Sequence, residues 1–143
     1  MTRKASHQGF RLLELGPLPI DAIEATLGIE LEAGPVVFTA SNQKHALKSH
    51  PDDFSRCLPH IGAVIANPMY LRDDLRNAGK IELISRIPAL GSGLLVAVEI
   101  RRDEQGRYRV ASMYPISQKK IDNRRQAGTL LIAKRKAPRM AGP

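Results

Sequence analysis

The sequence predicts a single α+β domain in which N-terminal helices pack on an antiparallel β-sheet of three to five strands, with a closing helix and a basic C-terminal tail. In the first half of the 143-residue chain, apolar residues recur at helical spacing. After residue 80, three runs rich in Ile, Val and Leu are joined by connections so short that they require antiparallel neighbours. Hydrophobic residues make up 43% of the chain and charged residues 25%, which is typical of a globular domain with a real core.

The N-terminal half is expected to alternate short strands and helices. Residues 1–9 are polar and predicted to be disordered, so the domain is expected to span 10–133. Before residue 50, the pattern predicts a strand at Phe10–Leu15 ended by Gly16-Pro17, a helix at Ile20–Leu27 stopped by Gly28, a strand at Val36–Thr39 and a helix capped by Ser41 and running to Lys48.

A further helical stretch is predicted from Pro51-Asp52 to Asn67-Pro68. It carries one apolar stripe, and Pro59 should kink or restart it because proline removes a backbone donor. The adjacent acids Asp73 and Asp74 are expected in a solvated loop. The members of the stripe are Phe54, Leu58, Ile61 and Ile65.

The second half predicts the sheet and the closing helix. The Gly91-Ser92-Gly93 segment is interpreted as a hairpin loop and not as a phosphate loop, because no GxGxxG or GK[ST] pattern follows it. The elements expected here are strands at Ile81–Ile87, Leu94–Arg101 and Arg107–Met113, a turn at 103–106, a helix from the cap Ser117 to about Ala127 with Gly128 as its stop, and a short strand at Thr129–Ala133.

Composition excludes several classes of protein. The single cysteine, Cys57, rules out an internal disulfide framework and a paired-cysteine zinc ribbon, and it suits a reducing compartment. No apolar run approaches the roughly 20 residues of a membrane helix, and the N-terminus lacks the apolar segment of a secretory signal. We therefore expect no membrane association.

The positive charge is concentrated at the C-terminal end. The whole chain carries a net charge of +8, and residues 117–143 hold eight basic side chains against Asp122 alone. Such a block is the electrostatic footprint of a polyanion binder, although a solubilising tail is the alternative. Removal of residues 129–143 is therefore expected to weaken polyanion binding and its salt dependence while changing stability little.

Two histidines, His45 and His50, lie among cations in the segment 44–51. Histidine changes charge near neutral pH unaided, which suits general acid or base work. On a straight helix these two side chains would point roughly 140° apart, but Pro51 biases His50 out of helical dihedrals, so the chain can turn there. The alternative is a core or capping role for at least one of them.

No metal site and no cofactor are expected. The HExxH pattern is absent, and His45, His50 and Asp52 would be an unusual ligand set for zinc. Adjacent carboxylates such as Asp52-Asp53 point apart on a strand or a helix, so a magnesium site is not favoured either.

A second group of polar residues follows the last strand. Alternation places Ser112 and Tyr114 on one face, and Ser117 then opens a helix whose first turn carries Lys119 and Lys120. Lysines there oppose the helix dipole, and an anion bound at the helix start would reverse that penalty. The alternative is that both lysines are simply solvated.

The segments "VVFTASNQKHALKSHP", "ANPMYL", "IELISRI", "LLVAVEI" and "YRVASMYPISQKKIDNRRQAG" together resemble the phage-associated barnase/EndoU/colicin/RelE-like nucleases. The resemblance covers residues 36–127. His45 and His50 match an H-x4-HP pair, and Tyr114, Ser117 and Lys120 match a closing motif in which Ser112 stands where threonine is commoner.

The resemblance implies a metal-independent, toxin-like endoribonuclease acting on RNA, with tRNA among the possible substrates, in the bacterial cytoplasm of the producer or of a target cell. It also implies an acidic immunity protein or antitoxin as partner. Alternatives of a different class are a non-catalytic nucleic-acid-binding module and an accessory interaction protein of a phage or mobile element. The expected catalytic residues are His45, His50, Tyr114, Ser117 and Lys120, and the expected RNA-binding residues are Lys119, Asn123, Arg124, Arg125, Lys134, Arg135 and Lys136.

Overall fold

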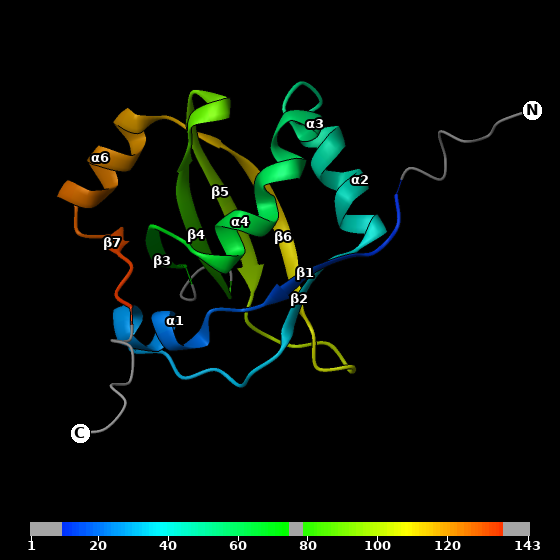
Figure 1. The fold of residues 1–143 in the computed structure, drawn as a ribbon, viewed down its shortest axis with the longest axis horizontal. Coiled ribbons are helices and arrows are strands. Elements are labelled where there is room, and N and C mark those ends of the chain that lie inside the picture. The colour runs from blue at the N-terminus through cyan, green and yellow to red at the C-terminus, as the bar shows by residue number, and fades with distance from the viewer. Residues whose placement is uncertain (1–9, 75–78, 136–143) are drawn as a thin grey trace, which may run out of the picture.

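The computed structural model describes residues 10–74 and 79–135, which form a mixed β-sheet with helices on both faces (Figure 1). The strands are β1 (Leu13–Pro17), β2 (Pro35–Phe38), β3 (Tyr70–Asp74), β4 (Lys80–Ile87), β5 (Ser92–Glu99), β6 (Tyr108–Ile116) and β7 (Leu131–Ile132). The helices are α1 (Ile20–Leu27), α2 (Ala40–Ser49), α3 (Phe54–Cys57), α4 (Ile61–Ala66) and α6 (Gln118–Gln126), with 3-10 turns η2 (Leu58–His60) and η3 (Pro88–Leu90).

The α+β class is confirmed, but the prediction of three to five antiparallel strands is wrong. The sheet has seven strands in the order β1-β2-β6-β5-β4-β3-β7. Its centre, β3-β4-β5-β6, is the predicted antiparallel meander. The N-terminal strand pair extends one edge and β7 extends the other. Strand β2 lies parallel to β6, and the long connection that a parallel pair requires is provided by the chain between them, which passes through three other strands.

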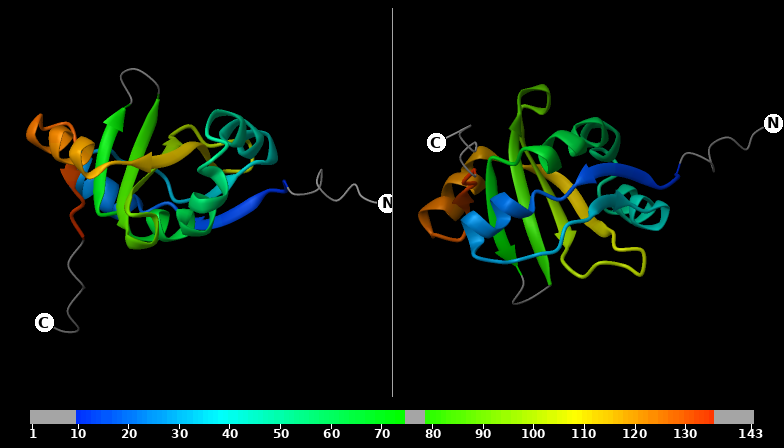
Figure 2. Two further views of the ribbon diagram at one scale, coloured as in Figure 1. Left: turned by 90° about the horizontal axis from the view of Figure 1, so that it is seen from above. Right: turned by 60° about the horizontal axis from the view of Figure 1, so that its bottom comes forward.

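The parallel pairing of β2 with β6 positions the helices that follow. It involves only Val36 with Tyr108 and Val37 with Arg109, so the C-terminal half of β6 extends beyond β2. Helix α2 follows β2 directly and contacts this part of β6, where the Asn42 side-chain amide donates to the Val110 carbonyl at 2.8 Å. Helices α2 and α3 therefore lie beside β6, on the opposite side of the molecule from α1 and α6 (Figure 2).

Several predicted boundaries move by a few residues. Thr39, not Ser41, caps α2: it has extended dihedrals and its hydroxyl accepts from the Asn42 N–H at 3.1 Å. The β4–β5 hairpin turns through η3 and Gly91 at φ +69°, so Ser92 and Gly93 belong to β5. Strand β1 begins later than expected and includes Gly16-Pro17. The segment 1–9, predicted to be disordered, lies outside the described residues.

Between residues 51 and 74, the sequence pattern predicts the helical stretch correctly but not the strand that follows it. The kink at Pro59 is confirmed, because η2 separates α3 from α4. The prediction of a loop at Asp73-Asp74 is wrong, since both residues belong to β3 and pair with β4. Three of the five residues of β3 are charged, so its sequence lacks the apolar signal that marks the strands on either side.

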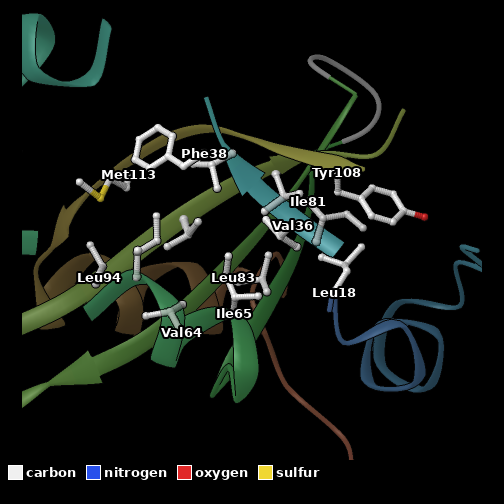
Figure 3. Close-up of a cluster of buried hydrophobic side chains, with 14 of the residues drawn as sticks. Leu18, Val36, Phe38, Val64, Ile65, Ile81, Leu83, Leu94, Tyr108 and Met113 are labelled. Carbon is white, nitrogen blue, oxygen red and sulfur yellow. The ribbon is translucent and has the colours of Figure 1, made fainter. Parts of the chain in front are cut away.

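The main core fills the sheet face covered by α1 to α4. Val64 and Ile65 of α4 pack against a cluster that includes Leu83 and Leu94 of the central strands, and all four are fully buried (Figure 3). Among the described residues, no helix combines the length and apolar character that crossing a membrane requires.

Helix α6 covers part of the opposite face. Its single buried residue, Ile121, joins Tyr70, Ile84 and Leu95 in a second, smaller apolar cluster. Ser117 caps the helix as predicted, with its hydroxyl accepting from the Lys120 N–H at 3.2 Å, and Gly128 at φ +79° follows its end. The predicted strand after it is reduced to the two residues of β7.

Candidate active site

His50 ends α2 in a conformation set by the proline that follows it. Its dihedrals, φ −138° and ψ 65°, are not helical, as expected for a residue before Pro51. The His50 carbonyl accepts from the N–H groups of Asp53 at 3.1 Å and Phe54 at 3.0 Å, which closes the turn into α3. The chain therefore changes direction at His50, and this turn brings the imidazole to the end of β6.

The His50 imidazole stacks on the ring of Tyr114. The ring centroids lie 5.3 Å apart with an interplanar angle of 26°. Stacking fixes the plane of the imidazole and thus the direction of its two nitrogens. Burial raises the pKa of Tyr114, the nearby Glu82 carboxylate raises it further, and Arg124 and Arg72 oppose the shift. The Tyr114 hydroxyl therefore stays protonated, as a proton donor must, throughout the neutral range.

These two rings border a pocket of about 440 Å³ at the start of α6. Helix α2 lies beside the C-terminal half of β6, which extends beyond β2, and α6 continues from the end of β6. The three elements therefore meet at this pocket. In Figure 1 the end of α2, α3 and the start of α6 all lie towards the top of the sheet, with α6 on the left and α2 and α3 on the right. The pocket is lined by His50, Asp53, Tyr114, Pro115, Ile116, Ser117, Lys120 and Arg124.

Cations and helix-start donors face this pocket. Lys120 is exposed in the first turn of α6, where it opposes the helix dipole as predicted. Arg124 lies one turn further along the same face. The N–H groups at a helix start lack partners within the helix, and together with two cationic side chains they form a setting that stabilises a bound anion.

A buried carboxylate, that of Glu82, forms an ion pair with Arg124 and was not predicted from the sequence. Glu82 of β4 has a side chain only 10% exposed and accepts from Arg72 of β3 at 2.9 Å, with Arg124 at 3.6 Å. A buried carboxylate is stable only when it is paired, and here two guanidinium groups pair with it. The alternation Lys80, Glu82, Ile84 along β4 was the available signal, since it places Glu82 on the face opposite the main core.

Asp53 is a charged residue of the pocket lining that sequence reasoning left out of the site. It was expected only as part of a helix start, and it does occupy the N-cap position of α3. Its carboxylate pairs with Arg56 at 2.7 Å, and the Arg56 guanidinium also donates to the Leu90 carbonyl at 3.3 Å. Asp53 thus adds one negative charge at the rim, partly compensated by Arg56.

The remaining predicted residues lie outside the lining of this pocket. His45 is exposed on α2, so the structure does not place it beside His50 in the pocket lining. Lys119, Asn123 and Arg125 are exposed on α6, and Lys134 and Arg135 are exposed after β7. The Lys134 backbone N–H donates to the Thr26 hydroxyl of α1 at 2.7 Å, whereas Lys136 lies outside the described residues.

Potential metal ligands do not gather in the part of the chain that the structure describes. Within residues 10–74 and 79–135, no group of three or more His, Cys, Asp or Glu side chains is placed to hold a metal ion. Cys57 is buried, and burial together with the Asp53 charge raises the pKa of its thiol, against a smaller opposing effect of Arg56.

Comparison with known proteins identifies a family for this chain. The family model described as phage-Barnase-EndoU-ColicinE5/D-RelE like nuclease3 matches residues 15–123, which include His50, Tyr114, Ser117 and Lys120. No curated protein and no solved structure gives a significant match. The match begins at β1 and spans both helical layers and the central meander. The chain therefore belongs to the phage-associated barnase/EndoU/colicin/RelE-like nucleases.

Proposed function

We propose that this chain is a metal-independent endoribonuclease that cleaves RNA by attack of a ribose 2′-OH on the adjacent phosphate, leaving a 2′,3′-cyclic phosphate. One observation carries the proposal: a single pocket brings together an imidazole, a protonated phenol and two cations. These are the groups that such a transfer needs, namely a base, an acid and donors around a phosphate that gains charge.

In the proposed mechanism His50 acts as the general base. Its neutral imidazole takes the proton of the 2′-OH as the O2′–P bond forms. The stacked Tyr114 ring orients His50, and Tyr114 itself gives its hydroxyl proton to the 5′-oxygen as the P–O5′ bond breaks. The reverse transfers reset both groups when water opens the cyclic phosphate or when solvent exchanges their protons.

The phosphate is proposed to bind at the start of α6. Lys120 and Arg124 supply positive charge to its non-bridging oxygens, and Ser117 supplies a hydroxyl whose oxygen already caps the helix. Glu82 limits the movement of Arg124 because it pairs with it from the buried side. Charge developing on the phosphorane thus meets groups that are already in place.

The substrate is proposed from this chemistry, and the partners are proposed from the family to which the chain belongs. Attack by a 2′-OH requires RNA at the cleaved position. We propose tRNA as one structured RNA that can enter the pocket. The polar and cationic residues Lys119, Asn123, Arg125, Lys134, Arg135 and Lys136 are proposed to contact flanking phosphates. Activity on cellular RNA would take place in the bacterial cytoplasm, and an acidic immunity protein or antitoxin would restrain it.

His45 remains a prediction as the second catalytic residue. It lies on the same helix as His50 and is exposed, so a role in the reaction requires the RNA to pass over α2 as well as over α6. Tyr114 is the better placed acid because it lines the pocket with His50. The test below separates the two.

The first prediction concerns cleavage itself. Purified protein with excess EDTA should shorten labelled RNA and leave 2′,3′-cyclic phosphate ends, and a single 2′-deoxy substitution at the cut site should block cleavage. His50→Ala should lower the rate by about 10²–10⁴-fold, the range for loss of a positioned acid or base. His45→Ala should lower it by much less.

His60→Ala is the matched control, because His60 lies in η2 and does not line the pocket. Its rate should equal that of the unmodified protein. A protein that binds RNA without shortening it would be a non-catalytic binding module, and cleavage only with added divalent metal would disprove the proposed mechanism. Equal losses of cleavage rate in His45→Ala and His50→Ala would indicate that the two histidines act as the acid–base pair and that Tyr114 is not the acid.

A further inference from the structure

Two arginines from different elements flank one tyrosine ring away from the His50 pocket. Tyr70 of β3 is 4% exposed, and the guanidinium carbons of Arg86 and Arg125 lie 5.7 Å and 5.6 Å from its ring centroid. Arg86 comes from β4 and Arg125 from α6, and both are exposed to solvent. We refer to Tyr70, Arg86 and Arg125 as the arginine clamp.

The clamp carries positive charge without a paired carboxylate. Among the described residues neither arginine forms an ion pair, and the side-chain hydrogen bond of Arg86 goes to the neutral amide of Gln118 at 2.8 Å. The Asp122 carboxylate borders the same surface pocket as Arg125 and accepts from the Gln118 amide at 2.8 Å. Two guanidinium groups held around one ring repel each other, and a bound anion would offset that repulsion.

The clamp and the His50 pocket lie on the same face of the sheet. Strand pairing places Tyr70, Ile84, Leu95 and Tyr114 in one row across β3, β4, β5 and β6. Three strand spacings of about 4.8 Å put the ends of this row about 14 Å apart. Ile121 packs on the middle of the row, so α6 lies between the two sites.

Helix α6 therefore presents cations on both of its flanks. Lys120 and Arg124 face the pocket at Tyr114, and Arg125 faces the clamp at Tyr70. A stacked nucleic-acid strand advances about 3.4 Å per nucleotide, so about four nucleotides, or fewer in an extended strand, would cover 14 Å. Because α6 lies between the two sites, the strand must pass round or over the helix, so about four nucleotides is the minimum and a strand of about eight can reach both sites.

We infer that the arginine clamp is a second phosphate-binding subsite, which holds the backbone of the same RNA strand a few nucleotides away from the cleaved bond. The inference rests on the proposed ribonuclease function for its choice of ligand. Guanidinium groups suit this ligand because their planar donors match phosphate oxygens. The buried Tyr70 ring keeps both groups in position before the strand arrives.

The test measures binding, so it does not depend on cleavage. Single-stranded oligonucleotides with 2′-deoxyribose throughout cannot undergo the proposed reaction, and lengths of about three and about eight nucleotides reach one site or both. The unmodified protein should bind the longer one more tightly. Arg86→Gln and Arg125→Gln should each weaken binding of the longer one about fivefold, the order expected for an exposed charge contact.

Both variants should change the affinity for the short oligonucleotide much less than the affinity for the longer one. Each should also reduce the salt slope of the longer one by about 0.7, the value for one phosphate contact of a single strand. Arg101→Gln is the matched control, because it removes the same charge from an exposed residue beyond the other end of β5, and it should preserve the gain with length. Thermal unfolding verifies that each variant is folded.

A structural explanation is tested by Gln118→Ala, which removes the link between β4 and α6 but keeps both arginines. If this variant loses the gain with length as Arg86→Gln does, the arginines act by holding α6 and the inference is wrong. Equal losses for both oligonucleotide lengths would also overturn it. The protein could instead bind the longer oligonucleotide more tightly without cleaving ribo-oligonucleotides. In that case the phosphate-binding subsite would stand and the proposed ribonuclease function would be wrong.

Discussion

At the scale of single residues, the protonation of Tyr114 links stability to chemistry. Burial raises its pKa above the ordinary value of 10.0, so the folded state favours the neutral phenol. A group with a raised folded-state pKa contributes stability that is fully present below the unfolded value and is lost as the pH rises through the folded one. The folded protein therefore holds this hydroxyl as a donor until the pH exceeds about 10.

The prediction for this residue concerns the pH profile of kcat/KM. With Tyr114 as the acid, kcat/KM should stay level through the neutral range up to about pH 10 and then fall, because an ionised phenol has no proton to donate. Tyr114→Phe should lower that level about 10²-fold or more without adding a new titration. Stopped-time cleavage assays across the pH range measure both.

Tyr108→Phe provides the control for loss of a phenol. The Tyr108 hydroxyl donates to the Glu32 carbonyl at 2.5 Å on the other side of the sheet, and burial raises its pKa as well. This variant should lose about 1 kcal/mol of stability, the usual value of one hydrogen bond, and should keep its cleavage rate. A bell-shaped profile confined to about pH 5–8 would contradict the role of Tyr114 and favour a histidine pair.

At the scale of elements, the seating of α6 depends on a glycine in β5. A Cβ at Gly93 would lie 2.9 Å from Ile121 Cδ1 and 3.1 Å from Ile116 Cγ2. Ile121 is the one buried residue of a helix that is otherwise polar, so few other contacts could retain the helix if this one moved. The position of Lys120 and Arg124 at the pocket thus depends on the absence of a side chain at residue 93.

We predict that Gly93→Ala displaces α6 and impairs both stability and cleavage. Overpacking of this kind costs about 1–3 kcal/mol, and a shift of the phosphate-binding cations should slow cleavage further. Gly62→Ala is the matched control, because a Cβ in α4 at that position meets nothing within 4 Å. It should leave cleavage unchanged and raise stability by about 0.5–1 kcal/mol, since alanine favours a helix. Chemical denaturation and cleavage assays compare the two, and a stable, fully active Gly93→Ala protein would contradict this account of α6.

The same scale shows what the sequence could predict. The turn at His50 and the cap at Ser117 depend on adjacent residues, Pro51 and the helix that follows, so local rules were sufficient. Glu82 contacts Arg72 because β3 pairs with β4, and it contacts Arg124 because α6 packs on the sheet. Neither contact can be predicted from residues adjacent in the sequence. The parallel approach of β2 to β6 also depends on the whole topology, which is why the number of strands was underestimated.

At the scale of the whole molecule, residues 129–135 near the C-terminus are part of the fold. Leu130 is 1% exposed in the second apolar cluster, β7 pairs with β3, and Lys134 contacts α1. The prediction that residues 129–143 can be removed with little effect on stability therefore needs correction. Only the residues after Arg135 lie outside the described structure at this end of the chain.

Two truncations should separate folding from binding. Ending the chain after Arg135 should leave the thermal midpoint unchanged and reduce the salt slope of RNA binding by about 0.7 for each phosphate that the protein no longer neutralises. Ending it after Gly128 should cost about 2–5 kcal/mol, the usual effect of removing a buried leucine. Calorimetry and salt-dependent binding measure the two effects, and unchanged stability in the shorter protein would contradict the structural role of β7 and Leu130.

The pairing of β2 with β6 also has a consequence for the time at which the pocket forms. Asn42 and Val110, which join α2 to β6, are 68 positions apart, so this hydrogen bond closes a long loop and must follow the local elements. The pocket residues extend from His50 to Arg124. A chain emerging from the ribosome therefore cannot assemble the site until almost all of the domain has been made, and an unfinished chain lacks the pocket on which the proposed activity depends.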